Sequence, residues 1–138
     1  MDLIDSHCHL DVAEFDADRE AVLQRARASG VHGIVVPGVT AGGWQGVWDL
    51  CAGEPDLYPA LGLHPVYLET HEAADIDRLG GWLTEHRPVA IGEIGLDYYL
   101  RELDRERQQL LFEAQLELAR DAGLPVILHV RKSHDQVL

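Results

Sequence analysis

Histidines and carboxylates stand where several short apolar runs of this chain end. His7 and His9 follow the first such run, Glu93 lies at the end of another, and His129 follows a third. Imidazole nitrogens and carboxylate oxygens are ligands for Zn²⁺, Mn²⁺ and Co²⁺, and Mg²⁺ is admissible where carboxylate and water dominate. These residue types therefore predict a divalent-metal centre, provided that the fold brings them together.

Each of these signals has an ordinary structural explanation as well. The pair His7 and His9 fits equally well two polar residues where a strand runs into a loop, and His64 is as easily a turn residue before Pro65 as a site residue. Glu93 is different, because a charge directly after a buried strand is costly unless it is paired or bound to metal. The metal interpretation is therefore favoured for Glu93.

Other polar and aromatic residues are expected to have structural roles. We expect solvated positions for the remaining histidines, and Cys8 should face the core rather than a ligand. Arg131 shares the face of His129 and fits either a substrate phosphate or one of the many carboxylates. The histidines expected at the surface are His32, His71, His86 and His134, and the tryptophans expected in an apolar helix stripe are Trp44 and Trp48.

The apolar runs predict five buried strands, separated by amphipathic helices. Parallel strands that are covered on both faces are continuously apolar, as these runs are. Asp16 or Asp18 can cap the first helix, Gly30 can end it, and Gly123 ends the last. The strands are expected near residues 3–4, 33–36, 57–63, 89–91 and 126–128, and the helices near 18–30, 44–51, 75–86 and 104–122.

The order βαβαβαβαβ predicts an α/β fold with neighbouring strands in one parallel sheet. A doubly wound open sheet is possible, but the glycine fingerprint that such folds carry after the first strand is absent here. A parallel barrel of the TIM type brings all carboxyl ends of its strands to one face, where His7, His9, His64, Glu93 and His129 would converge. We therefore expect residues 1–138 to form about the first half of one such barrel domain.

The composition limits the partners of the chain. Its 138 residues carry a formal net charge of -13, which repels nucleic acid unless a bound cation offsets it. No apolar stretch is long enough to cross a bilayer. The start of the chain lacks a basic region followed by an apolar one, and two cysteines are too few for a disulfide framework, so we expect a cytoplasmic location.

At this point the sequence resembles the TatD family of metal-dependent hydrolases, within the amidohydrolase-like barrels. Four motifs in order carry the resemblance: DSHCHLD at 5–11, GLHP at 62–65, GEIGLD at 92–97 and PVILHVR at 125–131. The resemblance implies a TIM-type barrel, a divalent-metal centre and nuclease activity on DNA, often as an exonuclease, and we expect that centre to hold two ions. It also implies ligand roles for His7, His9, Glu93 and His129, and places His64 near the substrate phosphate as a catalytic residue beside Glu93.

The chain departs from the family in length. Members have about eight βα units, and the resemblance implies a further histidine from the sixth strand and an aspartate from the eighth, neither of which lies within residues 1–138. The isolated chain is therefore expected to be inactive, to bind metal weakly and to self-associate through its open inner face.

Two alternatives to a deoxyribonuclease stay open. One is an amidohydrolase that cleaves a C–N or lactone bond with the same metals. Several such relatives bridge their ions with a carboxylated lysine on the fourth strand, whereas this chain has Glu93 there and its only lysine is Lys132. The other alternative is a catalytically incomplete half-barrel that persists by assembly.

Overall fold

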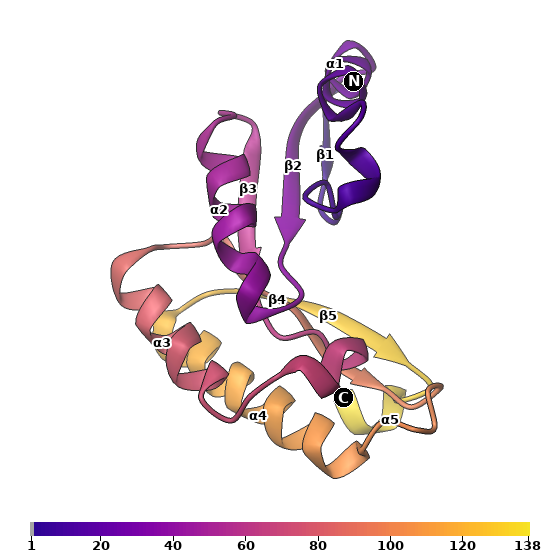
Figure 1. Cartoon of the computed structure of the whole chain (residues 1–138), viewed down its shortest axis with the longest axis vertical. Helices are drawn as coiled ribbons and strands as arrows, with labels where there is room; N and C mark the ends of the chain where they lie inside the picture. The colour runs from indigo at the N-terminus through magenta and orange to yellow at the C-terminus, as the bar shows by residue number, and fades with distance from the viewer. Residues whose placement is uncertain (1) are drawn as a thin grey trace.

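Five parallel strands form one sheet in which sequence order and spatial order coincide. The structure is a computed structural model that describes residues 2–138. The sheet order is β1-β2-β3-β4-β5, and every neighbouring pair is parallel (Figure 1). This arrangement confirms the predicted first half of a TIM-type barrel. The strands are β1 (Leu3–Asp5), β2 (Val31–Pro37), β3 (Leu57–Leu61), β4 (Ala90–Asp97) and β5 (Val126–Arg131).

Helices connect successive strands and pack against them. In Figure 1, α2 lies along β3, α4 lies beneath β4 and β5, and α3 lies beside α4. The α-helices are α1 (Arg19–Ala28), α2 (Trp44–Ala52), α3 (Asp75–Glu85), α4 (Arg105–Ala122) and α5 (His134–Val137). Three short 3-10 helices lie in the connections: η1 (Ala13–Phe15), η2 (Ala41–Gly43) and η3 (Pro65–Thr70).

Helix ends follow the local signals in the sequence at α4 more closely than at α1. The side chain of Asp104 accepts a hydrogen bond from the backbone N–H of Arg107 at 3.1 Å, and Gly123 ends α4 in the left-handed conformation with φ of 65°. At α1, Asp18 is the N-cap residue but its side chain makes no cap hydrogen bond. An aspartate therefore occupies the N-cap position of α1, as expected, but its side chain does not cap the helix.

The apolar core lies between the sheet and its helices. All eight residues of β4 are buried, as a parallel strand covered on both faces requires. Trp44 belongs to this core, as predicted, and its indole N–H donates to the carbonyl of Gly62 at 3.0 Å. The core also includes Leu23, Val36, Val47, Leu61, Leu79, Ile91, Ile94, Leu96 and Phe112.

The first and last strands contradict the prediction of five buried strands. No residue of β5 is fully buried, and its Leu128 is 44% exposed. Leu3 is 43% exposed and Ile4 is 74% exposed, although both are strongly apolar. Tyr58 is 40% exposed, and it lies with Ile4 beside Gly33, where a Cβ atom would come within 3.2 Å of the tyrosine ring. No described residue covers this side of the sheet, and apolar side chains therefore remain in contact with solvent.

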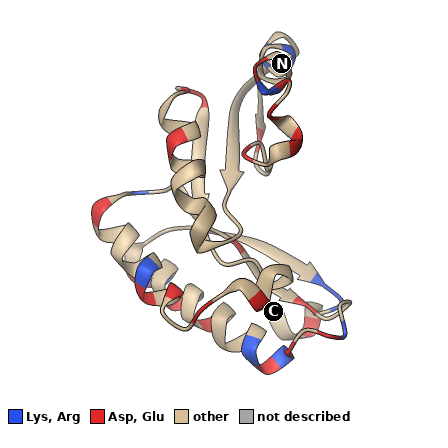
Figure 2. Cartoon of the chain, viewed as in Figure 1, with Lys and Arg blue, Asp and Glu red and all other residues tan. Residues whose placement is uncertain are grey.

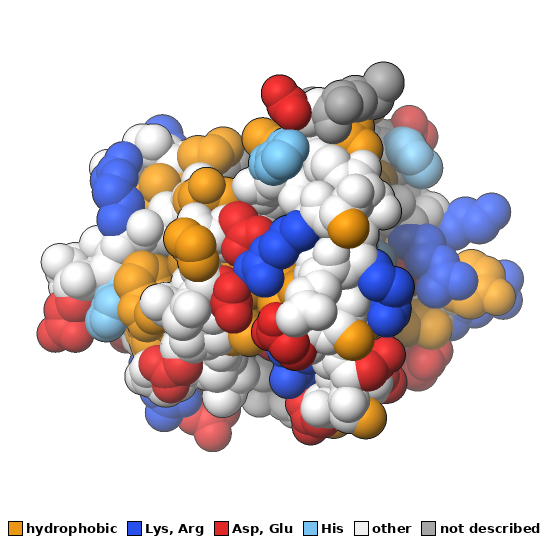
Figure 3. Space-filling view, turned by 90° about the horizontal axis from the view of Figure 1, so that it is seen from above, with side chains coloured by type: hydrophobic (Ala, Val, Ile, Leu, Met, Phe, Trp, Pro, Cys, Tyr) orange, Lys and Arg blue, Asp and Glu red, His pale blue; other side chains and the backbone are white. Residues whose placement is uncertain are grey.

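Charged side chains are spread over the whole molecule. Figure 2 shows acidic residues on helices and connections throughout, and Figure 3 shows acidic and basic side chains interspersed on one face. Within residues 2–138, no helix is both long and apolar enough to span a membrane. Because the acidic residues lie on helices and connections throughout the described chain, the net charge of -13 is not concentrated in one region.

Candidate metal centre

Glu93 is the centre of a cluster of imidazoles. It lies in the middle of β4, is only 6% exposed, and its carboxylate contacts four histidines. Its sequence position was predicted to follow a strand, but β4 continues through it to Asp97. The carboxylate therefore projects from the interior of a rigid element rather than from a loop.

The glycines beside Glu93 allow β5 to approach β4 closely. A Cβ atom on Gly92 would lie 2.6 Å from Cβ of Ile127, and one on Gly95 would lie 2.0 Å from the carbonyl oxygen of His129. Gly95 also has φ of 147°, a conformation that side chains disfavour. The absence of side chains at these two positions therefore lets β5 pass directly against β4 on either side of Glu93.

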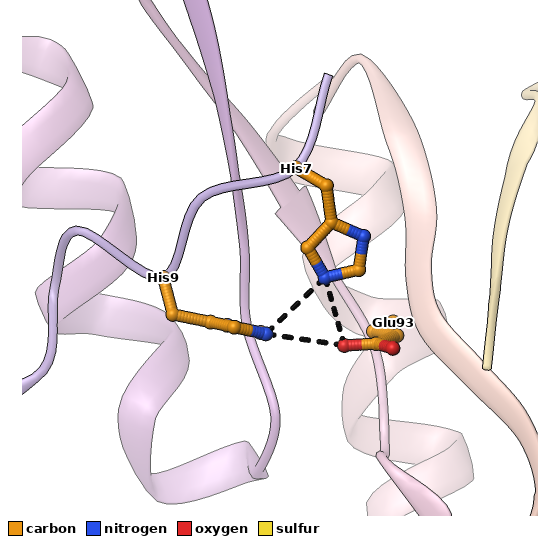
Figure 4. A group of neighbouring side chains, drawn as sticks. All are labelled: His7, His9 and Glu93. Atoms are coloured by element: carbon orange, nitrogen blue, oxygen red, sulfur yellow. Dashed lines mark hydrogen bonds and ion pairs between the residues drawn. The ribbon is translucent and has the colours of Figure 1, made fainter. Parts of the chain in front are cut away.

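His7 and His9 reach Glu93 from the loop after β1. Their Nε2 atoms lie 3.2 Å apart, and they lie 3.0 Å and 3.1 Å from Oε2 of Glu93 (Figure 4). Since β1 ends at Asp5, the two histidines stand on the loop that follows it and not on a strand. Arg19 holds this loop instead, donating from Nε to the carbonyl of Leu10 at 2.8 Å.

His64 combines the two roles that the sequence left open. It precedes η3, where its Nδ1 accepts a hydrogen bond from the backbone N–H of Val66 at 3.1 Å, so it is a turn residue. Its Nε2 also lies 3.3 Å from Oε2 of Glu93. Because Nδ1 accepts, the proton of a neutral His64 is on Nε2, and this ring donates to the carboxylate.

His129 contacts two carboxylates with its two ring nitrogens. Nδ1 lies 3.1 Å from Oε1 of Glu93, and Nε2 lies 2.9 Å from Oδ2 of Asp97. Asp97 is fully buried at the end of β4. No role was predicted for Asp97 from the sequence, although a charge in a buried strand needs a partner at this position just as it does at Glu93.

The electrostatics of the cluster stabilise charged forms on both sides. Burial by itself raises the pKa of Glu93, but hydrogen bonds from His129, His64 and His9 outweigh burial and hold this pKa well below its usual value. The hydrogen bond to Glu93 is also the main reason why the pKa values of His9 and His129 are raised. A compact, polarised site results.

The hydrogen bonds on the far side of the rings fit a cation at Glu93. Nδ1 of His9 lies 3.1 Å from the carbonyl oxygen of Pro37, which can only accept, so this nitrogen carries the proton. The neutral ring then presents a lone pair from Nε2 to a carboxylate oxygen. The lone pair on Nε2 of His9 and those of the carboxylate oxygen repel each other, so the contact is favourable only with a second proton on the ring or a cation shared by the two atoms. The raised pKa of His9 corresponds to the second proton.

The donor separations also suit a single ion. Ligand atoms bonded to one cation at about 2.0–2.2 Å lie roughly 3 Å or slightly more apart. The atoms of His7, His9 and Glu93 are separated by 3.0–3.2 Å. A second group lies around the same carboxylate and comprises His64, Glu93 and His129; of its two rings, His129 can present a lone pair, whereas His64 holds its proton on Nε2. The residues present therefore fit a centre of imidazole and carboxylate ligands built around Glu93.

The other histidines divide into exposed and buried groups. His32 and His134 are exposed, as expected. His71 contradicts the prediction of a solvated position: it is buried, its Nε2 lies 2.8 Å from the carbonyl oxygen of His64, and burial lowers its pKa. His86 is half-buried against Trp82, with ring centroids 4.5 Å apart. Packing of the connection after β3 and of the end of α3 explains both differences.

Cys8 and Arg131 both contact other residues of the chain. Cys8 packs against the apolar core, as predicted, and burial raises the pKa of its thiol. Arg131 stacks over the ring of Tyr99 at 3.8 Å and approaches Oδ2 of Asp97 at 3.9 Å. The structure therefore pairs Arg131 with a carboxylate, one of the two partners that the sequence left open.

Two buried glutamines on α4 hold the backbone on which the site residues stand. Gln115 accepts from the N–H of Leu63 at 2.7 Å, next to His64. Gln108 accepts from the N–H of Asp97 at 2.7 Å and donates to its carbonyl at 3.0 Å. Both were missed, and their only signal in the sequence was a polar residue in line with the apolar face of a helix.

Parallel strands whose carboxyl ends gather imidazoles and carboxylates are typical of metal-dependent hydrolases built on TIM-type barrels. The comparison with known families agrees with this class. A family model described as "TatD related DNase" matches residues 4–138, and the chain belongs to the TatD family. This finding confirms the resemblance seen in the sequence.

Relatives with related names extend well beyond the matched region. The chain is 47% identical over 137 residues to "Uncharacterized metal-dependent hydrolase YjjV" of Escherichia coli, covering 97% of this chain and 52% of that protein. It is 34% identical over 137 residues to "3'-5' ssDNA/RNA exonuclease TatD" of Erwinia tasmaniensis, covering 99% of this chain and 53% of that protein. The chain thus spans about half the length of these relatives.

Solved structures show the same fold over the same portion. The crystal structure of the TatD homologue YJJV from Escherichia coli superposes with a TM-score of 0.93 at 45% identity, over 97% of this chain and 52% of that one. A TatD family hydrolase from Entamoeba histolytica has a TM-score of 0.86 at 24% identity, again over 52% of its chain. The five strands therefore correspond to about half of a larger barrel.

Proposed function

We propose that this chain supplies half of the active site of a two-metal hydrolase that cleaves phosphodiester bonds of DNA. In this proposal His7, His9, Glu93 and His129 are the metal ligands, and His64 and Glu93 are catalytic. The observation that carries it is the arrangement at Glu93, where nitrogens that present lone pairs converge on one buried carboxylate.

Glu93 is suited to serve two ions because its oxygens face different histidines. Oε2 faces His7, His9 and His64, whereas Oε1 faces His129. The two groups of potential ligands share this residue alone. Glu93 would therefore be able to serve both ions of a centre with two divalent ions of Mg, Mn, Zn or Co, with His7 and His9 on one side of it and His129 on the other.

The residues of the chain divide the remaining work. When bound, divalent ions activate water as a nucleophile and neutralise phosphate charge. His64 holds a proton on Nε2 at the edge of the cluster, where it can donate to a phosphate oxygen as well as to Glu93. The carbonyl of Pro37 orients the ring of His9, and β4 holds the backbone of Glu93 in place among the histidines.

DNA is the substrate that the relatives favour. The name of the Erwinia relative describes a 3'-5' exonuclease on single-stranded DNA and RNA. The net charge of -13 opposes binding of a polyanion, so the positive charge needed at the scissile phosphate would come from the metal centre. A phosphodiester is accordingly the bond that two cations at Glu93 would best accommodate.

Completion of the site requires further βα units. Relatives matched by the chain are about twice its length, and a barrel closes only when its last strand pairs with its first. We propose that residues 1–138 are the N-terminal part of one barrel domain and that the other part adds a histidine and an aspartate. The isolated chain should then be inactive.

A chimera tests this proposal. The chain is joined to the C-terminal half of the YjjV relative, with which it shares 47% identity over the first half. The expected result is hydrolysis of a labelled single-stranded DNA oligonucleotide that stops on exhaustive chelation and returns with Mn²⁺ or Zn²⁺. The matched control is the same chimera with Glu93→Gln, which should be inactive whether or not metal is added.

Two results would contradict the proposal. Hydrolysis of DNA that survives complete metal removal would exclude the metal mechanism. Hydrolysis of a cyclic amide or lactone in preference to DNA would favour the amidohydrolase alternative. One solved structure of similar fold is described as an uncharacterized amidohydrolase from Saccharomyces cerevisiae.

A further inference from the structure

We propose that Asp97 is a positioning residue that keeps the proton of His129 on Nε2, so that the lone pair of Nδ1 faces Glu93. The inference deepens the proposed function and rests on it, because it assigns how one proposed ligand is prepared for a cation. Its observation is the 2.9 Å contact between Nε2 of His129 and Oδ2 of the fully buried Asp97.

The backbone fixes one oxygen of Asp97 and leaves the other for His129. Oδ1 accepts from the N–H of Tyr99 at 3.0 Å and from the N–H of Leu100 at 3.2 Å. Gln108 binds both the N–H and the carbonyl of Asp97. The side chain therefore cannot rotate without breaking these bonds, and Oδ2 stays directed at the imidazole.

The surroundings favour the ionised form of Asp97. Oδ1 accepts from two backbone N–H groups and Oδ2 faces the ring nitrogen of His129, so neither carboxylate oxygen faces another acceptor. Arg131 adds a positive charge 3.9 Å from Oδ2. An ionised carboxylate is an acceptor only, so the ring nitrogen that faces it must be the donor.

The consequence for His129 follows from imidazole chemistry. In the neutral ring one nitrogen carries a proton and the other a lone pair, and the partner of the first decides the choice. With Nε2 donating to Asp97, the lone pair of Nδ1 points at the region of Oε1 of Glu93, 3.1 Å away. Metal-binding histidines commonly donate their second N–H to a carboxylate in this manner.

The substitution Asp97→Asn isolates this role. The amide oxygen is expected to keep the place of Oδ1, because two backbone N–H groups require an acceptor there. The amide NH₂ then faces Nε2 of His129 and can only donate, which moves the proton of the imidazole to Nδ1. The variant thus changes which nitrogen holds the lone pair while changing little of the volume.

The readout is nitrogen-15 NMR of the histidine rings in the 138-residue chain, recorded at about pH 9, where imidazoles are neutral. His129 is identified by comparison with His129→Gln. The parent chain should show the Nε2–H form and Asp97→Asn the Nδ1–H form. Titration with Zn²⁺ alone should show about 10–100-fold weaker binding by the variant, the range typical of lost outer partners of metal ligands.

Asp75→Asn is the matched control. Asp75 is also buried, and it also accepts from a backbone N–H, that of Glu72 at 2.8 Å, but it lies at the start of α3 and outside the cluster around Glu93. This variant should leave both the His129 form and Zn²⁺ binding unchanged. Equal loss of Zn²⁺ binding in the two variants would assign the effect of Asp97 to general stability and overturn the inference.

The parent chain provides a test that does not depend on any variant folding. An Nδ1–H form of His129 in the parent would overturn the inference directly. Failure of the proposed function looks different: no Zn²⁺ uptake by the parent, with the expected ring forms in both proteins, would contradict a metal centre while the assignment of Asp97 to the His129 proton stands.

Discussion

Glu93 shows how a single residue can tie the site together. A buried carboxylate loses much hydration, and only strong partners offset that cost. Here the partners are imidazoles from three separate segments, the loop after β1, the end of β3 and β5. Charge-assisted hydrogen bonds to one carboxylate therefore link parts of the chain that are distant in sequence.

The first prediction concerns Glu93→Gln. The amide keeps the shape of the side chain but removes the negative charge, so Zn²⁺ binding by the chain should weaken by more than about 100-fold, beyond the range for outer partners. Isothermal titration or NMR titration with Zn²⁺ measures this loss. Glu72→Gln, at an exposed carboxylate that pairs with Arg78, is the control and should bind as the parent does.

A parent-like affinity in Glu93→Gln would place the metal elsewhere and remove the basis of the proposed hydrolase. Loss of affinity in both variants would point instead to nonspecific attraction of cations by the net charge of -13. The two outcomes are separable because Glu93 is buried among histidines whereas Glu72 is exposed.

At the residue scale, the sequence predicts which groups meet but not how each proton is placed. The types and spacing of His7, His9, Glu93 and His129 were sufficient to expect convergence, since parallel strands end at one face. The contact of Asp97 with Nε2 of His129 was not predicted in this way, because it depends on which edge of the imidazole ring faces the carboxylate. Which nitrogen donates depends on distances that only three-dimensional contacts supply.

At the element scale, α4 does more than cover the sheet. Gln108 and Gln115 lie two turns apart on the same helix face, and each binds the backbone of a strand end or the residue just beyond it. Buried N–H and C=O groups that no strand pairs must find other partners. The two side chains provide them beside Asp97 and His64.

The second prediction concerns Gln115→Met, which keeps the approximate size of the side chain but removes its polar atoms. The N–H and carbonyl of Leu63 lose their partner inside the protein, and the free energy of unfolding should fall by about 1–3 kcal/mol. Urea unfolding followed by circular dichroism measures the loss. Gln109→Met on the same helix, where the side chain is exposed, should change stability little.

A small effect at Gln115 equal to that at Gln109 would show that Leu63 finds another partner. A larger loss accompanied by altered ring signals of His64 would support the view that α4 sets the position of the turn after β3.

The third prediction concerns an ion pair that joins α1 to the segment before β3. Arg27 donates from Nε to Asp56 at 2.7 Å and from Nη2 to Glu54 at 2.6 Å, and the hydrogen bond from Arg27 lowers the pKa of Asp56. A lowered pKa in the folded state adds stability above the ordinary value near 3.9, and that stability disappears as pH falls through the folded value.

Arg27→Gln should therefore destabilise the chain at pH 7, and the difference from the parent should shrink as the pH falls below about 4. Urea unfolding at several pH values measures it. Arg120→Gln serves as the control, because its pair with Asp121 is largely exposed at 71% and 67% and should contribute nothing measurable. A difference that grows at low pH would contradict the assignment to Asp56.

Element order was predictable because continuous apolar runs and helix stripes repeat at the length of one βα unit. Element bounds were less so. The apolar run at 89–91 predicted a strand that ends before Glu93, but β4 extends to Asp97 because Gly92 and Gly95 let it pair closely with β5. Hydrophobicity alone cannot reveal a strand continued by glycine and carboxylate.

At the scale of the whole molecule, the sheet has one covered face and one that is open near β1. The strand order ends at β1 and β5 among residues 2–138, so each of these strands has one unpaired edge in the described part of the chain. An incomplete barrel was predicted from the length of the chain against the eight βα units of the family, and all five apolar strands were expected to be buried. Burial depends on what lies opposite, and Ile4 has nothing opposite within the described residues.

The last prediction is that a second copy of the chain covers this open face. Ile4 and Tyr58 lie together beside Gly33 and expose apolar surface near the unpaired edge of β1, a combination that favours association. Sedimentation velocity at increasing concentration should therefore show association of the isolated 138-residue chain. Ile4→Lys should weaken it at least about 10-fold, the equivalent of roughly 1.4 kcal/mol, because a buried ammonium would be unpaired at the contact.

Leu110→Lys is the matched control: Leu110 is 69% exposed but lies on α4, away from β1, so that variant should associate as the parent does. A parent chain that stays monomeric at all concentrations would contradict the prediction, and equal weakening by both substitutions would show that added charge, rather than the face around Ile4, controls association.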